Sequence, residues 1–210
     1  MTKRKTILLN VLGLFFLAYG VFAVDYAIYR DQPSWAFWVC YVGMVLIGIG
    51  LLVRNSKLVI SQLYLLTIPL VIWLTDFTSK VVTNQHWLGV TDYFFKELLL
   101  PARIISLEHF IVLPLGYFGF WLLGGERRGA WLLSLVEVTI IYLIIRAVTD
   151  PLQNVNCVFE SCLPFVPTDS FYPLRWFGIA VGIILASLAA VELSIYLFKK
   201  IIYNKRGLEN

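Results

Sequence analysis

A glutamate and a histidine stand side by side in the segment SLEHFIVLP, residues 106–114, at the start of an otherwise apolar stretch. Ionisable side chains are costly at membrane depth, so a histidine inside an apolar span is a functional-site hypothesis. An imidazole can act as a general base or orient a nucleophile. His109 is therefore the first candidate for a functional residue.

Other polar residues are expected at the height of His109, near the outer ends of the apolar stretches. Asp76 follows the third stretch, Arg146 ends the fifth, and Asp150 comes four residues later. At about 1.5 Å per residue, His109 and Arg146 lie at comparable depths in antiparallel helices. Such groups are expected to form a hydrated polar pocket under the outer loops.

Two interpretations of these residues stay open. In an enzyme the catalytic residues would be His109, Asp76 and Asp150, with His109 activating a hydroxyl such as that of Thr75 or Ser106. In a binding or scaffold protein, the same groups would hold a ligand or pair with one another to fix loops onto helix ends.

The binding interpretation adds polar groups at or just outside the membrane surface. The expected ligand-binding residues are Asp92, Arg146, Asn154 and Asn156. Arg146 and Asp150 are four residues apart and can equally form an ion pair. No cofactor is expected, and no metal site, because His86 and His109 are the only histidines and show no paired spacing.

The three cysteines divide into two kinds. Cys157 and Cys162 lie in one long connection and predict a structural disulfide if their compartment is oxidising. Their spacing is not that of a C-x-x-C redox motif. Cys40 lies inside the second apolar stretch and reads as a small apolar residue.

Two more glutamates favour a third and weaker hypothesis. Glu137 and Glu192 are expected within the fifth and sixth apolar stretches, roughly 10 Å from the opposite membrane surface. They could serve a small-solute or proton transporter. The absence of a visible internal repeat speaks against this hypothesis.

The composition sets the class of protein that positions these residues. Of the 210 residues, 60% are apolar and 14% are charged, which excludes an ordinary soluble domain. We expect one integral membrane domain over residues 1–210, an all-α bundle of six transmembrane helices. The expected spans are 7–28, 35–53, 58–75, 104–124, 130–148 and 174–198. The first is expected to be a retained span rather than a signal peptide.

The basic residues predict the orientation. With both termini in the cytoplasm, 11 of the 17 lysines and arginines fall on the cytoplasmic side and 6 on the other. The long connections 76–103 and 149–173 then lie outside, and TDYFFKELLL in the first predicts a helix in the membrane interface. Scattered basic residues do not favour nucleic acid. The expected partners are membrane lipid and a membrane-protein partner.

Four segments together resemble an uncharacterised family of bacterial integral membrane proteins. They are LGVTDYFF at 88–95, SLEHFIVLP at 106–114, GERRGA at 125–130 and TDPLQNVNCVF at 149–159. The resemblance implies a shared signature consisting of Asp92, His109, Asp150, Asn154 and Asn156. It implies no reaction. The chain departs from the family pattern at Cys157, where tryptophan is usual, and at Glu126, where aspartate is usual.

A looser likeness is to the six-span androgen-induced hydrolases, which cleave fatty-acid esters of hydroxy fatty acids with a threonine and a histidine. The shared features are six spans, a histidine at the start of the fourth and an asparagine-rich outer loop. The chain has no threonine at the start of the second span, and Ser34 there follows Pro33. The likeness implies a membrane-embedded lipid or ester hydrolase using His109, at the level of fold alone.

The leading hypothesis is accordingly a multi-pass protein of the cell membrane with a polar pocket on its extracytoplasmic side. The pocket would bind a lipid head group, a small polar ligand or a membrane partner. Whether the protein is an enzyme stays open.

Overall fold

The computed structural model describes residues 2–96, 99–163 and 165–207, with side chains up to residue 196. All regular structure in these ranges is helical, which confirms the all-α prediction. The elements are α1 Lys3–Tyr29, η1 Pro33–Phe37, α2 Val39–Leu52, α3 Ser56–Thr83, α4 Asp92–Phe95, α5 Leu100–Ser106, α6 Glu108–Leu122, α7 Ala130–Val148, η2 Pro151–Gln153, η3 Val155–Cys157 and α8 Tyr172–Gly207.

Five segments of the described chain are long and apolar enough to cross a membrane. They are Lys3–Tyr29, Ser56–Thr83, Leu100–Leu122, Ala130–Val148 and Tyr172–Tyr196. The sixth apolar helix, α2, has 14 residues and follows the short 3-10 helix η1, so the second expected span divides into two pieces.

The connection expected over residues 76–103 differs from its prediction in two ways. Helix α3 runs to Thr83, eight residues beyond the expected end of the third span. The interfacial helix expected in TDYFFKELLL is the single turn α4, whose C-cap is Lys96. The two residues after Lys96 lie outside the described ranges. A second short helix, α5, then leads into α6 through Leu107.

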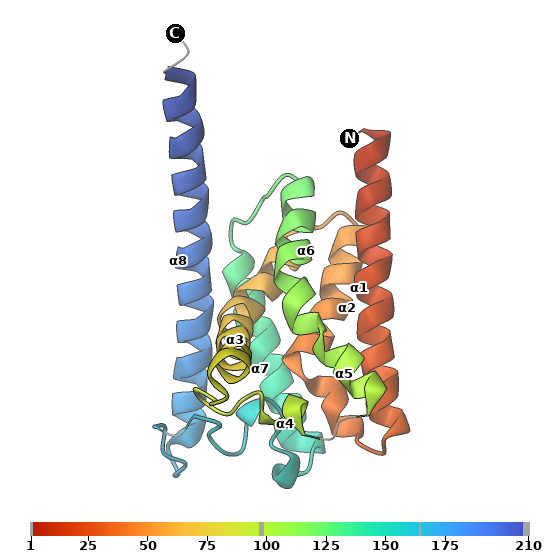
Figure 1. Cartoon of the computed structure of the whole chain (residues 1–210), viewed down its shortest axis with the longest axis vertical. Helices are drawn as coiled ribbons and strands as arrows, with labels where there is room; N and C mark the ends of the chain where they lie inside the picture. Colours follow the sequence, from red (N-terminus) through yellow and green to blue (C-terminus); the bar gives the residue numbers. More distant parts are fainter. Residues whose placement is uncertain (1, 97–98, 164, 208–210) are drawn as a thin grey trace.

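The long helices stand side by side, with the two long connections gathered at one end (Figure 1). Helices α1 and α8 flank the bundle, and the first residue of α1 and the last turn of α8 lie at the same end. Helix α4, the start of α5 and the connection between α7 and α8 lie at the opposite end. Both long connections therefore meet on one side of the molecule.

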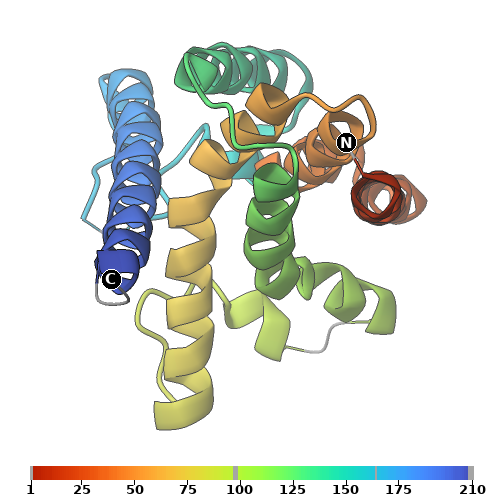
Figure 2. The ribbon, with the colours of Figure 1, turned by 90° about the horizontal axis from the view of Figure 1, so that it is seen from above.

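Helix α3 forms the centre of the bundle. Seen from above, it passes between α8 on one side and α6 on the other (Figure 2). Leu63 and Tyr64 are fully buried in its first half. Pro69, in the middle of the helix, cannot donate a hydrogen bond to the carbonyl four residues earlier, which favours a bend. The second half then leaves the bundle, and Val82 near its end is exposed.

Helices α1 and α2 approach each other through glycine. A Cβ atom added to Gly48 would lie 2.7 Å from the backbone nitrogen of Leu17 and 2.9 Å from the carbonyl oxygen of Gly13. Small residues permit this contact between helix backbones, as at many helix interfaces in membranes. The close contact fixes α2, and with it the position of Cys40.

Candidate functional site

Three side chains of different chemistry meet between α2 and α6. A nitrogen of His109, an oxygen of Glu108 and the sulfur of Cys40 all lie within 4.8 Å of one another. We call this group the buried centre. Glu108 is 1% exposed and the side chain of His109 is 13% exposed. The centre therefore brings a thiol, a carboxylate and an imidazole together with little access to solvent.

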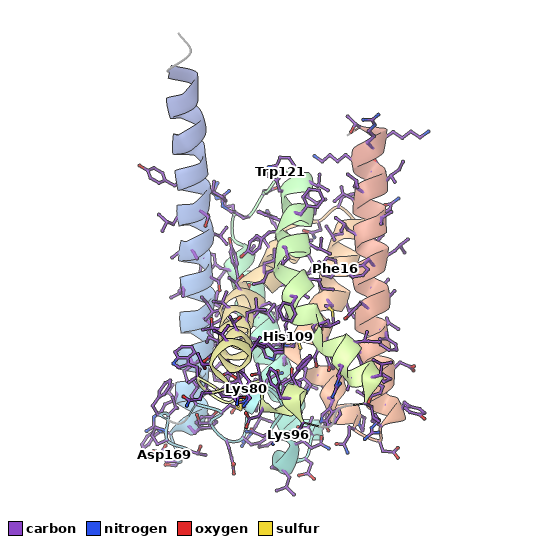
Figure 3. All side chains as sticks on the ribbon, in the orientation of Figure 1. Phe16, Lys80, Lys96, His109, Trp121 and Asp169 are labelled. Atoms are coloured by element: carbon purple, nitrogen blue, oxygen red, sulfur yellow. A yellow bond between two sulfur atoms is a disulfide. The ribbon has the colours of Figure 1, made fainter. Side chains whose placement is uncertain are left out.

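The break between α5 and α6 determines where two of these residues lie. The chain leaves α5 at Leu107 and resumes a helix at Glu108, so Glu108 and His109 occupy the first turn of α6. Both side chains thus project from a helix start near the loop end of the bundle. Figure 3 shows His109 inside the bundle, above Lys96 at the loop end and below Trp121 near the opposite end.

Cys40 lies in the first turn of α2, and a loop residue fixes this turn. The side-chain oxygen of Asn156 accepts a hydrogen bond from the backbone N–H of Val39 at 3.1 Å. The amide nitrogen of Asn156 donates to the carbonyl oxygen of Phe37 at 2.8 Å. Asn156 therefore joins the end of η1 to the start of α2 and positions Cys40, although it was expected to bind a ligand.

Glu108 is the group whose environment is hardest to explain by folding alone. Within the described part of the chain, neither of its carboxylate oxygens has a hydrogen-bond partner of good geometry. The Cys40 thiol is close enough to act as a weak donor. A buried carboxyl group without strong partners is costly whether it is charged or neutral.

His109 is oriented from two directions. Its ring stacks on the indole of Trp73, with the ring centroids 4.2 Å apart. Its Nδ1 atom lies 2.9 Å from the carbonyl oxygen of Ser106 and 3.8 Å from Oε1 of Glu108. Trp73 thus fixes one face of the imidazole and Ser106 fixes one edge. The ring is held beside Glu108 in the buried centre.

Aromatic side chains extend from Trp73 to the loop between α3 and α5. Phe77, Phe94 and Phe110 each pack against Trp73. Burial of its hydroxyl raises the pKa of Tyr93 to about 12, so this phenol is neutral. It accepts a hydrogen bond of 3.0 Å from the indole N–H of Trp73. Residues Tyr93 and Phe94 of this loop therefore cover the Trp73–His109 stack.

Asp76 holds this loop on the end of α3. The carboxylate is fully buried and accepts hydrogen bonds from the backbone N–H groups of Leu88, Gly89 and Thr91, at 2.6, 3.1 and 2.9 Å. It also accepts from the hydroxyl of Thr91 at 2.6 Å. These contacts give Asp76 a structural position, and among the described residues it makes no hydrogen bond to His109.

His86, in this loop, lies between two acidic side chains, Asp76 of α3 and Asp92 of α4. Its Nδ1 lies 3.3 Å from Oδ2 of Asp76, and its Nε2 lies 2.8 Å from Oδ1 of Asp92. The second histidine thus belongs to the loop and not to the buried centre. Asp92, expected to bind a ligand, is its partner.

The remaining expected site residues lie in the connection between α7 and α8. Asp150 accepts a hydrogen bond from the backbone N–H of Leu152 and so caps η2. Asn154 accepts from the N–H groups of Phe159 and Glu160. The guanidinium of Arg146 lies 4.9 Å from the ring centre of Phe159. These contacts order the loop.

Cys157 and Cys162 are joined by a disulfide in the structure. The hydroxyl of Tyr172, at the start of α8, donates a hydrogen bond to the carbonyl oxygen of Cys157. The disulfide therefore lies between the residue that positions α2, Asn156, and the start of α8.

The hydroxyls considered as nucleophiles already have partners in their own helices. Thr75 donates to the carbonyl oxygen of Val71 at 2.8 Å, and Ser106 donates to that of Ala102 at 3.0 Å. Such bonds to a preceding turn are common in helices and do not activate an oxygen. Cys40 is the residue beside His109 whose side chain carries nucleophilic character.

The two deeper glutamates lie in separate contacts. Glu137 accepts a hydrogen bond from the side-chain amide of Gln62 at 2.6 Å. Glu192 accepts two hydrogen bonds from the guanidinium of Arg127, as a bidentate ion pair. Helix α3 therefore pairs with α7 through one glutamate, while the α6–α7 connection pairs with α8 through the other.

Cys40 is the member of the buried centre that the sequence analysis did not select. Its position in the sequence could have indicated it. Cys40 lies near the start of the second apolar stretch, and His109 lies near the start of the fourth. Together the three side chains can bind a cation, move a proton or activate a thiol. Comparison with protein-family models, curated proteins and solved structures gives no match for this chain.

Proposed function

We propose that the chain is an integral membrane protein that binds a positively charged ligand at the buried centre of Cys40, Glu108 and His109. The observation that carries this proposal is the carboxylate of Glu108, which is buried with neither oxygen in a strong hydrogen bond. A cation or a hydrogen-bond donor would offset that cost. The proposal keeps the predicted binding role and His109, but places the site between α2 and α6 instead of beside Asp76 and Asp150.

The surroundings of the centre support a binding role. The stack of His109 on Trp73 and the hydrogen bond of Asn156 to the start of α2 hold two of the three groups in place. Preorganised groups lose less entropy when a ligand binds. Residues of α3, α5 and η3 thus hold the side chains of the centre in place. Packing of α2 against α6 alone would not require this support.

We place the centre on the extracytoplasmic side, with both termini in the cytoplasm. The support is the distribution of basic residues, 11 against 6, and the disulfide in the connection between α7 and α8. The apolar surfaces of α1, α7 and α8 would face membrane lipid, because many large apolar side chains on them are exposed.

A thermal-shift experiment tests the proposal. The full chain in lipid nanodiscs is heated with ethanolamine, choline, Zn²⁺ or Co²⁺ as separate probes. We expect at least one probe to raise the Tm of the wild-type protein and to lose this effect in Glu108→Gln. The matched control is Glu126→Gln, because Glu126 lies on the surface in an ion pair with Lys57.

The outcome depends on which variants respond. A probe that stabilises the wild type and Glu126→Gln alike, and leaves Glu108→Gln unchanged, supports binding at the centre. If no probe shifts the wild-type Tm, or if Glu108→Gln shifts as much as the wild type, the centre does not bind a cation and the proposal is wrong.

A further inference from the structure

We infer that the ligand of the buried centre is a single divalent metal ion of borderline softness, Zn²⁺ being the best match, bound by Cys40, Glu108 and His109. The inference rests on the proposed function and names its ligand. It starts from the donor set, since sulfur, imidazole nitrogen and carboxylate oxygen are the three ligand types that Zn²⁺ takes in proteins.

The distances within the centre suit one ion. Bond lengths of about 2.0 to 2.3 Å around a tetrahedral ion place its ligand atoms roughly 3.3 to 3.8 Å apart. Each of the three side chains offers one ligand atom, and these atoms lie within 4.8 Å of one another. The observed limit exceeds the tetrahedral separation by about 1 Å, a difference that side-chain torsions can supply.

Charge favours a divalent ion over other cations. A thiolate and a carboxylate together carry two negative charges, which one divalent ion neutralises when the imidazole is neutral. Net charge is costly in an apolar interior, so a neutral complex is the form that such a site can hold. An ammonium group would neutralise only one of the two.

The donor set also separates candidate ions. Ca²⁺ and Mg²⁺ prefer several oxygen ligands, and the centre offers one carboxylate. Thiolate and imidazole favour Zn²⁺ and neighbouring transition metals. Three protein ligands leave a fourth position open, the arrangement typical of zinc ions that bind a water molecule or a substrate.

The surroundings resemble those of a supported metal ligand. A metal-bound histidine usually has its ring orientation fixed by a carbonyl, a carboxylate or a water molecule. Here the carbonyl oxygen of Ser106 and the indole of Trp73 fix the imidazole of His109. Since the carbonyl oxygen of Ser106 accepts a hydrogen bond from Nδ1, Nε2 is the nitrogen left to bind the ion.

Cobalt(II) is the probe for the test, because a bond between Co²⁺ and a thiolate gives a charge-transfer absorption in the near ultraviolet. The full chain in nanodiscs is treated with a chelator, freed of it and titrated with Co²⁺. We expect one equivalent to bind, the charge-transfer band to appear, and Zn²⁺ to displace the Co²⁺. The disulfide leaves Cys40 as the one free thiol.

Variants identify the ligands. Cys40→Ser, close in size to cysteine, should abolish the charge-transfer band, while Glu108→Gln and His109→Gln should weaken Co²⁺ binding by more than roughly 100-fold. The controls are His86→Gln and Glu126→Gln, which should bind like the wild type. Elution volume and Tm without metal show that each variant is folded.

The outcomes separate this inference from the proposed function. The metal assignment is overturned if the wild type shows no band, or if Cys40→Ser and His109→Gln bind Co²⁺ as tightly as the wild type. In those cases a Glu108-dependent Tm shift with ethanolamine or choline would leave the proposed function standing. No shift with any probe would overturn both.

Discussion

The imidazole of His109 lies almost parallel to the indole of Trp73, with an angle of 20° between the rings and 4.2 Å between their centroids. This stack joins α3 to α6 at the level of the buried centre. It leaves the ring little freedom to turn, so the nitrogen that faces Glu108 and Cys40 stays in place.

We expect Trp73→Leu to weaken Co²⁺ binding by roughly 10- to 100-fold, the usual cost of removing a group that supports a metal ligand. Trp73→Phe should lose less, because a smaller ring can still stack. The titration described above measures both. The control is Trp121→Leu, since Trp121 is 70% exposed near the opposite end of the bundle. Equal losses in Trp73→Leu and Trp121→Leu would contradict a supporting role.

Asp76→Ala should lower stability by about 3 to 5 kcal/mol, because it leaves three backbone N–H groups, that of buried Thr91 among them, without their acceptor. The amides of Leu88, Gly89 and Thr91 should then exchange hydrogen much faster, which mass spectrometry can measure. Asp150→Ala is the comparison and should cost about 1 kcal/mol, since Asp150 only caps a short helix. Unchanged exchange at the three amides would show that another group holds the loop.

Gly48→Ala should destabilise the protein by about 1 to 3 kcal/mol, because the added methyl group meets the backbone of α1 and forces two helices apart. Gly182→Ala is the matched control in α8, where an added Cβ has no atom within 4 Å of it among those described. It should be neutral, or stabilising by up to about 1 kcal/mol. The Tm values of the two variants decide, and similar values would contradict the close contact of α1 with α2.

Metal affinity should fall as the pH is lowered, because protons compete with the ion for the thiolate, the carboxylate and the imidazole. The expected loss is up to about tenfold per pH unit for each proton taken up. Co²⁺ titrations between pH 8 and pH 6, spanning roughly the range where histidine titrates, measure it. If the affinity for Co²⁺ does not change with pH, no proton leaves the thiol when the ion binds. Cys40 would then not be a ligand that is protonated in the metal-free protein.

Much of the fold could be predicted because each long helix has its own apolar run. The lengths and the low charge of these runs predicted α1 and α7 closely, whereas the run 104–124 is divided at Leu107 between α5 and α6, and α8 continues beyond residue 198 to Gly207. The extension of α3 beyond Thr75 could not be predicted in this way. Its last turns carry Asp76 and Lys80, and they are helical because the loop that follows folds back onto them.

The candidate site was harder to predict, since it depends on which side chains face each other. Asp76, His109 and Asp150 were expected at similar heights, but height does not determine the face of a helix. Asp76 turns toward its own loop and Asp150 toward η2, while Glu108 points to Cys40. One sequence carries no information on such pairings when the partners lie 68 residues apart, as Cys40 and Glu108 do.

Asn156 supports the start of α2, and its neighbour Cys157 is bonded to Cys162. Reducing that bond would loosen the loop segment that carries Asn156, whose side chain is hydrogen-bonded to the start of α2, the helix of Cys40. A reductant that reaches this loop would thus change the geometry around a thiol that it never touches. The side chain of Asn156 would couple the Cys157–Cys162 disulfide in the loop to Cys40 in the interior of the helical bundle.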